Sequence, residues 1–294
     1  MAGAPQRRLW LHAGLHKTGS TYIQAMLAQE QERLAGAGVF FRRPEGPIEG
    51  NYPEAWALQQ GDLEPLLAYA RGGFGTGANQ VLLSAEDLSS LLVRPGLGVE
   101  LVQAVRRECD ASVALAVYLR RPSAQFWSMV GQLAGHGYYD PFQLLAQALR
   151  DGFVRVAEPA PGDFFAPEWL YLLDHGSHLS RFRRRVPGAS LRLFDFDSEA
   201  YPGAGLFAAL GIDPALPAAP PPAARNAGVA AEALPAIMVE KLSDTLPDDP
   251  AAATVEAAAA ARTAVPARVR RAISAVIDAR FAAGSRSLLE GAAT

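Results

Sequence analysis

The sequence predicts an α/β fold, in which a mostly parallel sheet is flanked by helices on both faces. Three observations carry this prediction. Stretches such as residues 8–13 and 111–122 are almost continuously apolar, as in strands that are buried on both faces. Segments with helical spacing follow these stretches, which is the alternation typical of α/β proteins. A glycine-rich turn follows the first stretch, where ligands bind at the carboxyl ends of parallel strands.

The elements follow in order along the first 212 residues. Strands are expected at residues 8–13, 38–41, 79–87, 111–122 and 190–196, and the third of these segments runs into the start of a helix. Helices are expected at residues 20–35, 52–70 and 97–109, after Pro122, and at 203–212. Pro122 favours a helix start because proline is well tolerated in the first helical turn.

The composition of the chain changes after residue 212. We therefore divide it into a nucleotide-binding core (1–212), a Pro/Ala-rich linker (213–226) and an Ala-rich helical segment (227–294). Helices are expected in this last segment near residues 227–246, 251–262 and 265–283. Two alternatives stay open for it: a helical cap on the same domain, or a surface for a partner.

Composition excludes several classes of function. The chain has 294 residues, 50% of them apolar, and a net charge of −3, which does not indicate a nucleic-acid partner. A single cysteine, Cys109, excludes an intramolecular disulfide and a cysteine zinc site, and it fits a reducing compartment. No secretory leader and no run of about 20 apolar residues is present, so we expect a cytoplasmic protein without a membrane span. The five histidines are scattered, so no metal is expected. The oligomeric state is not predicted.

The turn GLHKTGST (14–21) is the most informative stretch. Gly14 and Gly19 have the spacing of a Walker A phosphate loop, but Ser20 stands where that loop has its lysine, and Lys17 lies inside the turn. Backbone amides and the following helix N-terminus still favour an anion. Of the 27 basic residues only two are lysines, so a lysine here indicates a need for a compact ammonium.

HKTGSTYIQ (16–24) resembles the 5′-phosphosulfate loop of sulfotransferases that use 3′-phosphoadenosine 5′-phosphosulfate (PAPS), of the bacterial type. Ser20 departs from the threonine of that motif but keeps its hydroxyl. The resemblance implies a P-loop type of nucleotide-binding fold. It also implies that the phosphosulfate is bound by Lys17, Thr18, Gly19, Ser20 and Thr21.

A second motif agrees with the first. In the family, an arginine at a strand end and a serine eight residues later hold the 3′-phosphate, and a proline often lies two residues after the arginine. The stretch LRRPSAQFWSMV supplies these residues as Arg120, Ser128 and Pro122. A guanidinium and a hydroxyl are suited to that phosphate, which ATP lacks. Arg121 is interpreted as a solvated neighbour, although it could exchange roles with Arg120.

The resemblance implies transfer of a sulfuryl group from PAPS to an acceptor hydroxyl, without a metal. Lys17 would stabilise the leaving phosphate. Glu86, after the third strand, is the first candidate for the general base, by analogy with the glycan-modifying members. Ser84 and Asp87 resemble a capping box, however, so Glu86 could be only a first-turn charge. His16 is the second candidate and His136 the third.

Three other segments have weaker interpretations. RFRRRVPG (181–188) could attract an acidic acceptor, but cations at a helix end are the simpler explanation. The aromatic stretch 164–171 could line the acceptor pocket or belong to the core. RNAG (225–228) is a weak candidate for nucleotide contact.

Two other functions compete with this hypothesis. A P-loop kinase or NTPase would use ATP and magnesium, and it would need a free acid at a strand end, such as Glu86 or Asp87. A non-catalytic protein could have kept the fold; a blocked crevice, or Lys17 turned away from it, would indicate this. The acceptor, a small molecule or a glycan, is not specified by the sequence.

Overall fold

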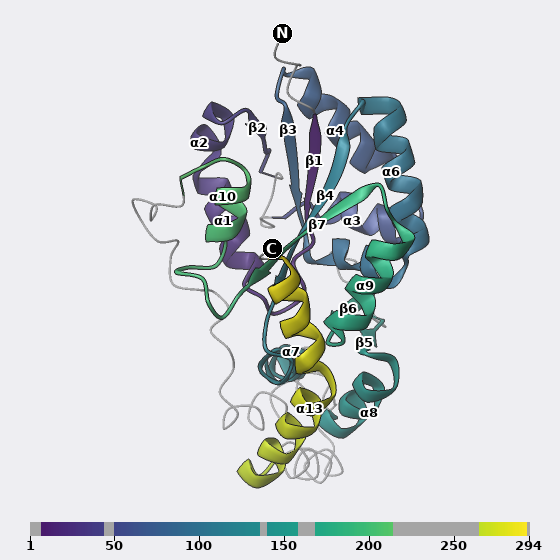
Figure 1. Ribbon diagram of the computed structural model, residues 1–294, viewed down its shortest axis with the longest axis vertical. Helices are drawn as coiled ribbons and strands as arrows, with labels where there is room; N and C mark the ends of the chain where they lie inside the picture. The colour runs from purple at the N-terminus through teal and green to yellow at the C-terminus, as the bar shows by residue number, and fades with distance from the viewer. Residues whose placement is uncertain (1–6, 44–49, 136–139, 158–167, 214–264, 293–294) are drawn as a thin grey trace, which may run out of the picture.

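A five-stranded parallel sheet lies at the centre of the protein (Figure 1). The computed structural model describes residues 7–43, 50–135, 140–157, 168–213 and 265–292. The strand order is β2-β3-β1-β4-β7 and every adjacent pair is parallel, which confirms the predicted α/β class. The strands are β1 (Arg8–His12), β2 (Val39–Phe40), β3 (Gln80–Ser84), β4 (Ser112–Leu119) and β7 (Ala189–Asp195).

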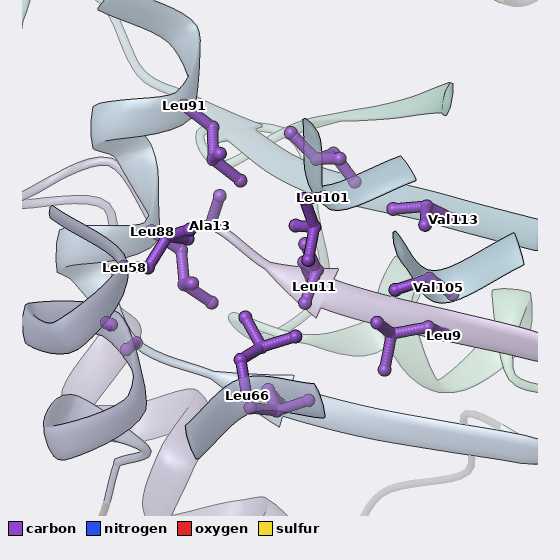
Figure 2. Close-up of a cluster of buried hydrophobic side chains, with 14 of the residues drawn as sticks. Leu9, Leu11, Ala13, Leu58, Leu66, Leu88, Leu91, Leu101, Val105 and Val113 are labelled. Atoms are coloured by element: carbon purple, nitrogen blue, oxygen red, sulfur yellow. The ribbon is translucent and has the colours of Figure 1, made fainter. Parts of the chain in front are cut away.

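Both faces of the sheet are buried, as the continuous apolar strands predict. Successive side chains of a strand point to opposite faces. On β1, Leu9 and Leu11 pack into one hydrophobic cluster, while Trp10 packs into another. Figure 2 shows the first cluster, where Leu11 lies among leucines from the surrounding helices.

Helices cover both faces of the main sheet. Leucines of α3 (Tyr52–Gln59), α4 (Glu64–Gly75) and α6 (Pro95–Cys109) pack on the Leu11 face, and α1 (Ser20–Gln29), α2 (Gln31–Gly36) and α10 (Ala204–Ala209) cover the Trp10 face. Two of the helices predicted from the sequence are each divided in two in the structure. The predicted helix 52–70 breaks at Gly61, whose φ of 88° is incompatible with a continuous helix. The helix 20–35 breaks at Glu30, which ends α1 and precedes α2.

A second layer lies below the main sheet in Figure 1, and the sequence prediction missed its two strands. β5 (Phe153–Val156) and β6 (Trp169–Leu172) form a small antiparallel sheet. Around it lie α7 (Pro122–Gly135), α8 (Pro141–Asp151) and α9 (His175–Arg185). The two strands, α7 and α8 share a third hydrophobic cluster with the C-terminal helix α13 (Ala267–Ala292), whereas Leu179 and Phe182 of α9 pack into the cluster on the Leu11 face. Both strands have only four residues, too few for a clear periodic pattern.

The C-terminal helix begins directly after Pro266, as predicted, but it continues to Ala292 instead of ending near residue 283. It packs against α7 and α9. The linker from residue 214 and the other two helices predicted in this segment lie outside the described residues. Within the described ranges, no single helix is both long and apolar enough to cross a membrane.

Candidate functional site

The glycine-rich turn connects β1, the central strand, to α1. Thr18 is fully buried, and both its backbone N–H (3.1 Å) and its hydroxyl (2.6 Å) donate to the carbonyl oxygen of Leu15. Lys17 and Gly19 have left-handed backbones, with φ of 72° and 79°. A positive φ is uncommon for a residue with a side chain and costs on the order of 1–3 kcal/mol, so the surroundings must hold Lys17 in place.

Steric contacts explain why both Gly14 and Gly19 of the turn are glycines. A Cβ on Gly14 would lie 2.2 Å from the hydroxyl oxygen of Ser20, and one on Gly19 would lie 2.7 Å from the ring of Phe196. Gly19 also needs its positive φ. The spacing of the two glycines thus follows from the tight packing of this turn.

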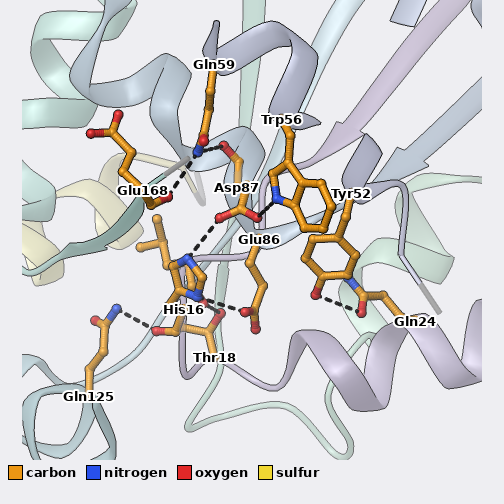
Figure 3. Close-up of polar contacts among 11 residues, drawn as sticks. His16, Thr18, Gln24, Tyr52, Trp56, Gln59, Glu86, Asp87, Gln125 and Glu168 are labelled. Atoms are coloured by element: carbon orange, nitrogen blue, oxygen red, sulfur yellow. Dashed lines mark hydrogen bonds and ion pairs between the residues drawn. The ribbon is translucent and has the colours of Figure 1, made fainter. Parts of the chain in front are cut away.

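Glu86 and Asp87 follow β3 and face His16 of the turn (Figure 3). The Nδ1 atom of His16 lies 2.8 Å from a Glu86 carboxylate oxygen, and its Nε2 atom lies 3.4 Å from one of Asp87. The other Asp87 oxygen accepts a hydrogen bond of 2.6 Å from the indole of Trp56. The imidazole, 3% exposed, packs on the ring of Tyr171 with 4.7 Å between ring centroids.

The charges of this cluster follow from its geometry. Burial alone would lower the pKa of His16, but Glu86 and Asp87 outweigh it and raise that pKa to about 10. Burial would raise the pKa of Glu86, but His16 and Lys17 oppose it and the net pKa is lowered. His16 is therefore a buried cation at neutral pH, and Glu86 is a carboxylate.

The capping-box interpretation of Ser84 and Asp87 is wrong. The hydroxyl of Ser84 lies 2.7 Å from Nδ1 of His12, and Asp87 faces Trp56 and His16. The turn that starts here, η1 (Glu86–Ser89), has no side-chain cap. Glu86 is thus more than a charge in a first helical turn, because its carboxylate belongs to the His16 cluster.

Arg120 follows β4 and reaches the same turn. Its Nη1 donates a 2.9 Å hydrogen bond to the carbonyl oxygen of Lys17, and its guanidinium lies 5.1 Å from the ring centre of Phe196. Its Nε is buried and has no hydrogen-bond partner among the described residues. Arg121 points elsewhere, since it is 67% exposed and pairs with Asp278 of α13. This geometry supports the assignment to Arg120 over the exchange of roles.

Lys17 lies between opposite charges. Burial lowers its pKa, the carboxylate of Glu86 opposes this, and Arg120 adds to the lowering. An anion bound beside Lys17 and Arg120 would relieve their mutual repulsion. The edge of the sheet where β1, β3 and β4 end therefore gathers the loop, two cations and an ionised carboxylate.

The remaining predicted residues lie on α1 and α7. Ser20 is buried and Thr21 half-buried in the first turn of α1. Ser128 is half-buried on α7, one turn beyond Gln125 and on the same helix face. Gln125 touches the turn directly, since its side-chain amide donates to the carbonyl of His16 at 3.0 Å.

Sequence analysis did not identify Trp56 and Gln125, which come from helices far away in the sequence and which no local pattern marks. It considered Asp87 only as a helix cap or as the acid of a kinase, although Asp87 adjoins Glu86 at a strand end. It considered Tyr171 only as part of the aromatic stretch 164–171. The arginines at residues 183–185 occupy the last turn of α9, which supports their helix-end interpretation.

Some candidates lie outside the described residues: His136, residues 164–167 of the aromatic stretch, and residues 225–228. The described part of that stretch is residues 168–171, of which Trp169 to Tyr171 belong to β6, and Tyr171 is buried in the third hydrophobic cluster. Over the part of the chain that the structure describes, no group of three or more His, Cys, Asp or Glu side chains is placed to hold a metal ion.

Comparison of this chain with known proteins identifies no relative. No family model matches it, and neither does any curated protein or solved structure.

The functional groups of the site indicate which ligands it can bind. Backbone amides of the turn, Lys17 and Arg120 can hold phosphate-like oxygens, and Glu86 can accept a proton or a hydrogen bond from a neutral ligand.

Proposed function

We propose that the protein is a PAPS-dependent sulfotransferase that acts on a hydroxyl group, of a small molecule or a glycan. The observation that carries the proposal is the hydrogen bond from Arg120 to the carbonyl of Lys17. It joins the two motifs that resemble the family, one from β1 and one from β4, at a single edge of the sheet. The distance of about 100 residues between them in the sequence does not require this contact.

The proposed reaction is an in-line displacement. The acceptor oxygen attacks sulfur, the bond from sulfur to the 5′-phosphate oxygen breaks, and 3′-phosphoadenosine 5′-phosphate leaves with the electron pair. Lys17 and the amides of the turn stabilise the charge that develops on this leaving group. Arg120 and Ser128 hold the 3′-phosphate.

Glu86 is the proposed base, since it is ionised and 15% exposed just beyond the end of β3. The acceptor proton moves to its carboxylate. His16 is unsuited to this step because it already holds a proton, so we assign it the role of orienting Glu86. The buried, unpaired Cys109 fits the reducing cytoplasm, where we expect the enzyme to act.

An ATP-dependent kinase is less well supported. Ser20, in place of the usual lysine, is 1% exposed, and both carboxylates after β3 face the protonated His16, so neither is free for magnesium. A fold without a catalytic role fits less well too, because Lys17 is largely buried and the charges of both Glu86 and Arg120 act on its ammonium group.

Calorimetric titration with 3′-phosphoadenosine 5′-phosphate tests the proposal, with ADP and ATP–magnesium as comparison ligands. We expect tight binding without metal, weakened on the order of 10- to 100-fold by Lys17→Ala or Arg120→Ala, since each removes a charged hydrogen-bonding group. Arg106→Ala is the matched control, because Arg106 is an exposed cation near the end of α6, at the opposite edge of the sheet. A preference for ATP–magnesium, or no binding, would overturn the proposal.

A further inference from the structure

A chain of buried polar side chains connects the C-terminal helix to the phosphate turn. Gln125 of α7 donates to the carbonyl of His16, and its Oε1 lies 3.1 Å from Nε2 of His175 on α9. The Nδ1 atom of His175 lies 2.8 Å from the hydroxyl of Ser285 on α13. Gln125 and His175 are fully buried and Ser285 is 7% exposed, so water does not compete for these bonds.

The direction of each hydrogen bond follows from the groups involved. Burial lowers the pKa of His175 to about 4, so the imidazole is neutral at physiological pH. Gln125 uses its amide nitrogen toward the turn, which leaves its oxygen to accept from Nε2–H of His175. Nδ1 of His175 then accepts from the hydroxyl of Ser285, which also lies 3.4 Å from the carbonyl oxygen of Phe281, one turn earlier on α13. Each link of the chain thus has a donor and an acceptor, and such a paired buried chain is rigid.

The turn needs this support. The strained backbone of Lys17 is flanked by two carbonyls that distant side chains hold: Gln125 holds that of His16, and Arg120 holds that of Lys17. A non-glycine residue with positive φ persists only where its surroundings determine its conformation. The hydrogen bond from Gln125 is one of these determinants, and α13 helps to fix it.

Two further contacts fix the position of α13 itself. A Cβ on Gly176 of α9 would lie 2.9 Å from the Cα of Gly284, so the backbones of α9 and α13 meet where a side chain would not fit. Asp278 accepts hydrogen bonds from the backbone (3.1 Å) and hydroxyl (2.8 Å) of Ser123, at the start of α7. Asp278 thus caps α7, the helix that carries Gln125.

We propose that Ser285 and His175 are positioning residues, through which the C-terminal helix holds the phosphate turn in its ligand-binding conformation. The inference has two parts. The expectation that these residues affect nucleotide affinity rests on the proposed function. The expectation that they hold the conformation of the turn does not, because it concerns the free protein.

Amide hydrogen exchange of the turn, followed in peptides that cover residues 13–22 of the full chain, tests the conformational part. We expect Ser285→Ala to accelerate exchange there by about fivefold, equivalent to a lost hydrogen bond of about 1 kcal/mol. Ser285→Thr, which keeps the hydroxyl, should restore slow exchange. His175→Phe, which removes both ring nitrogens from the chain, should also accelerate exchange. If this variant fails to fold, the two serine variants still decide the question.

Ser274→Ala is the matched control. Ser274 also lies on α13, and its hydroxyl accepts a 2.9 Å hydrogen bond from Trp127 of α7, but it is not connected to the turn. We expect this variant to leave exchange of residues 13–22 unchanged. Equal exchange in Ser285→Ala and wild type, or equal acceleration in both alanine variants, would overturn the inference.

Titration with 3′-phosphoadenosine 5′-phosphate separates the two proposals. We expect Ser285→Ala to weaken binding about fivefold and Ser274→Ala to leave it unchanged. If the wild-type protein does not bind this nucleotide, the proposed function fails, while the exchange result still judges the positioning role. If it binds equally to wild type and Ser285→Ala, the positioning role in affinity is wrong and the function stands.

Discussion

His16 holds a proton that its burial would otherwise remove. The two carboxylates beside it compensate for burial, and its pKa rises from 6.5 to about 10 on folding. The stabilisation that comes from this shift is fully present below pH 6.5 and is lost progressively as the pH rises toward 10. The residue thus makes the stability of the glycine-rich turn (14–21) dependent on pH between about 6.5 and 10.

Replacement of His16 should show this dependence. We expect His16→Gln to lower the melting temperature most at pH 6, where removal of one partner of a buried ion pair costs about 3–5 kcal/mol. The difference from wild type should shrink as the pH approaches 10. Thermal unfolding followed by circular dichroism at several pH values between 6 and 10 measures it.

His12→Gln provides the control for this prediction. His12 is equally buried, but burial lowers its pKa to about 4 despite the nearby Glu86, so it is neutral throughout this pH range. The deficit of His12→Gln should therefore be slightly smaller at pH 6, where unfolded His12 binds a proton that the folded protein does not, and constant above about pH 8. A deficit of His16→Gln that also stayed constant from about pH 8 to 10 would contradict the charged state that we assign to His16.

Among the secondary-structure elements, α4 shows how closely a helix can lie on the sheet. A Cβ on Gly73 would lie 2.6 Å from the ring of Phe40 on β2 and 2.7 Å from a methyl of Val81 on β3. One on Gly72, the preceding residue, would meet nothing within 4 Å. Alanine substitutions at these two neighbouring glycines therefore separate the effect of packing on stability from the effect of helix propensity.

We expect opposite effects from the two alanine substitutions. Gly73→Ala should destabilise the protein by about 1–3 kcal/mol, because an extra methyl group overpacks the contact between helix and sheet. Gly72→Ala should stabilise it by about 0.5–1 kcal/mol through helix propensity alone. Urea unfolding midpoints measure both, and a shift of the same sign in the two variants would show that α4 does not lie as close to the sheet as described.

The sequence predicted those elements whose pattern is local. β1, β3 and β4 are apolar runs, and their carboxyl ends meet at one edge because the strands are parallel, which brings Lys17, Glu86 and Arg120 together. The helix breaks at Glu30 and Gly61 were missed, since each interrupts a pattern that continues on both sides. Contacts such as Gln125 with His16 depend on packing between distant segments, and no residue spacing encodes them.

At the scale of the whole molecule, α13 joins parts that are distant in the sequence. Its residues Ile273, Ile277 and Phe281 pack with α7, α8, β5 and β6, and Leu288 packs into the cluster on the Leu11 face of the main sheet. One helix thus contributes to two of the three hydrophobic clusters. We therefore expect the described part of the chain to unfold as one cooperative unit.

Neighbouring residues of α13 test this expectation. Ile277 is fully buried and Val276 is 47% exposed. Ile277→Ala should cost about 2–5 kcal/mol through the cavity that it leaves, whereas Val276→Ala should change stability by about 0.5 kcal/mol or less. For a chain of this size each kcal/mol shifts the melting temperature by about 2–4 °C, so differential scanning calorimetry resolves the two variants.

The shape of the transition carries the stronger test. If α13 is integral to the fold, Ile277→Ala moves one single transition to lower temperature, and secondary structure and tryptophan fluorescence are lost together. If α13 were a separate unit, the variant would instead produce an early transition of small enthalpy and leave the main one in place. The hydrogen-bond chain from Ser285 to His16 requires the first outcome, because a helix that melted independently could not hold the glycine-rich turn at temperatures where the sheet is still folded.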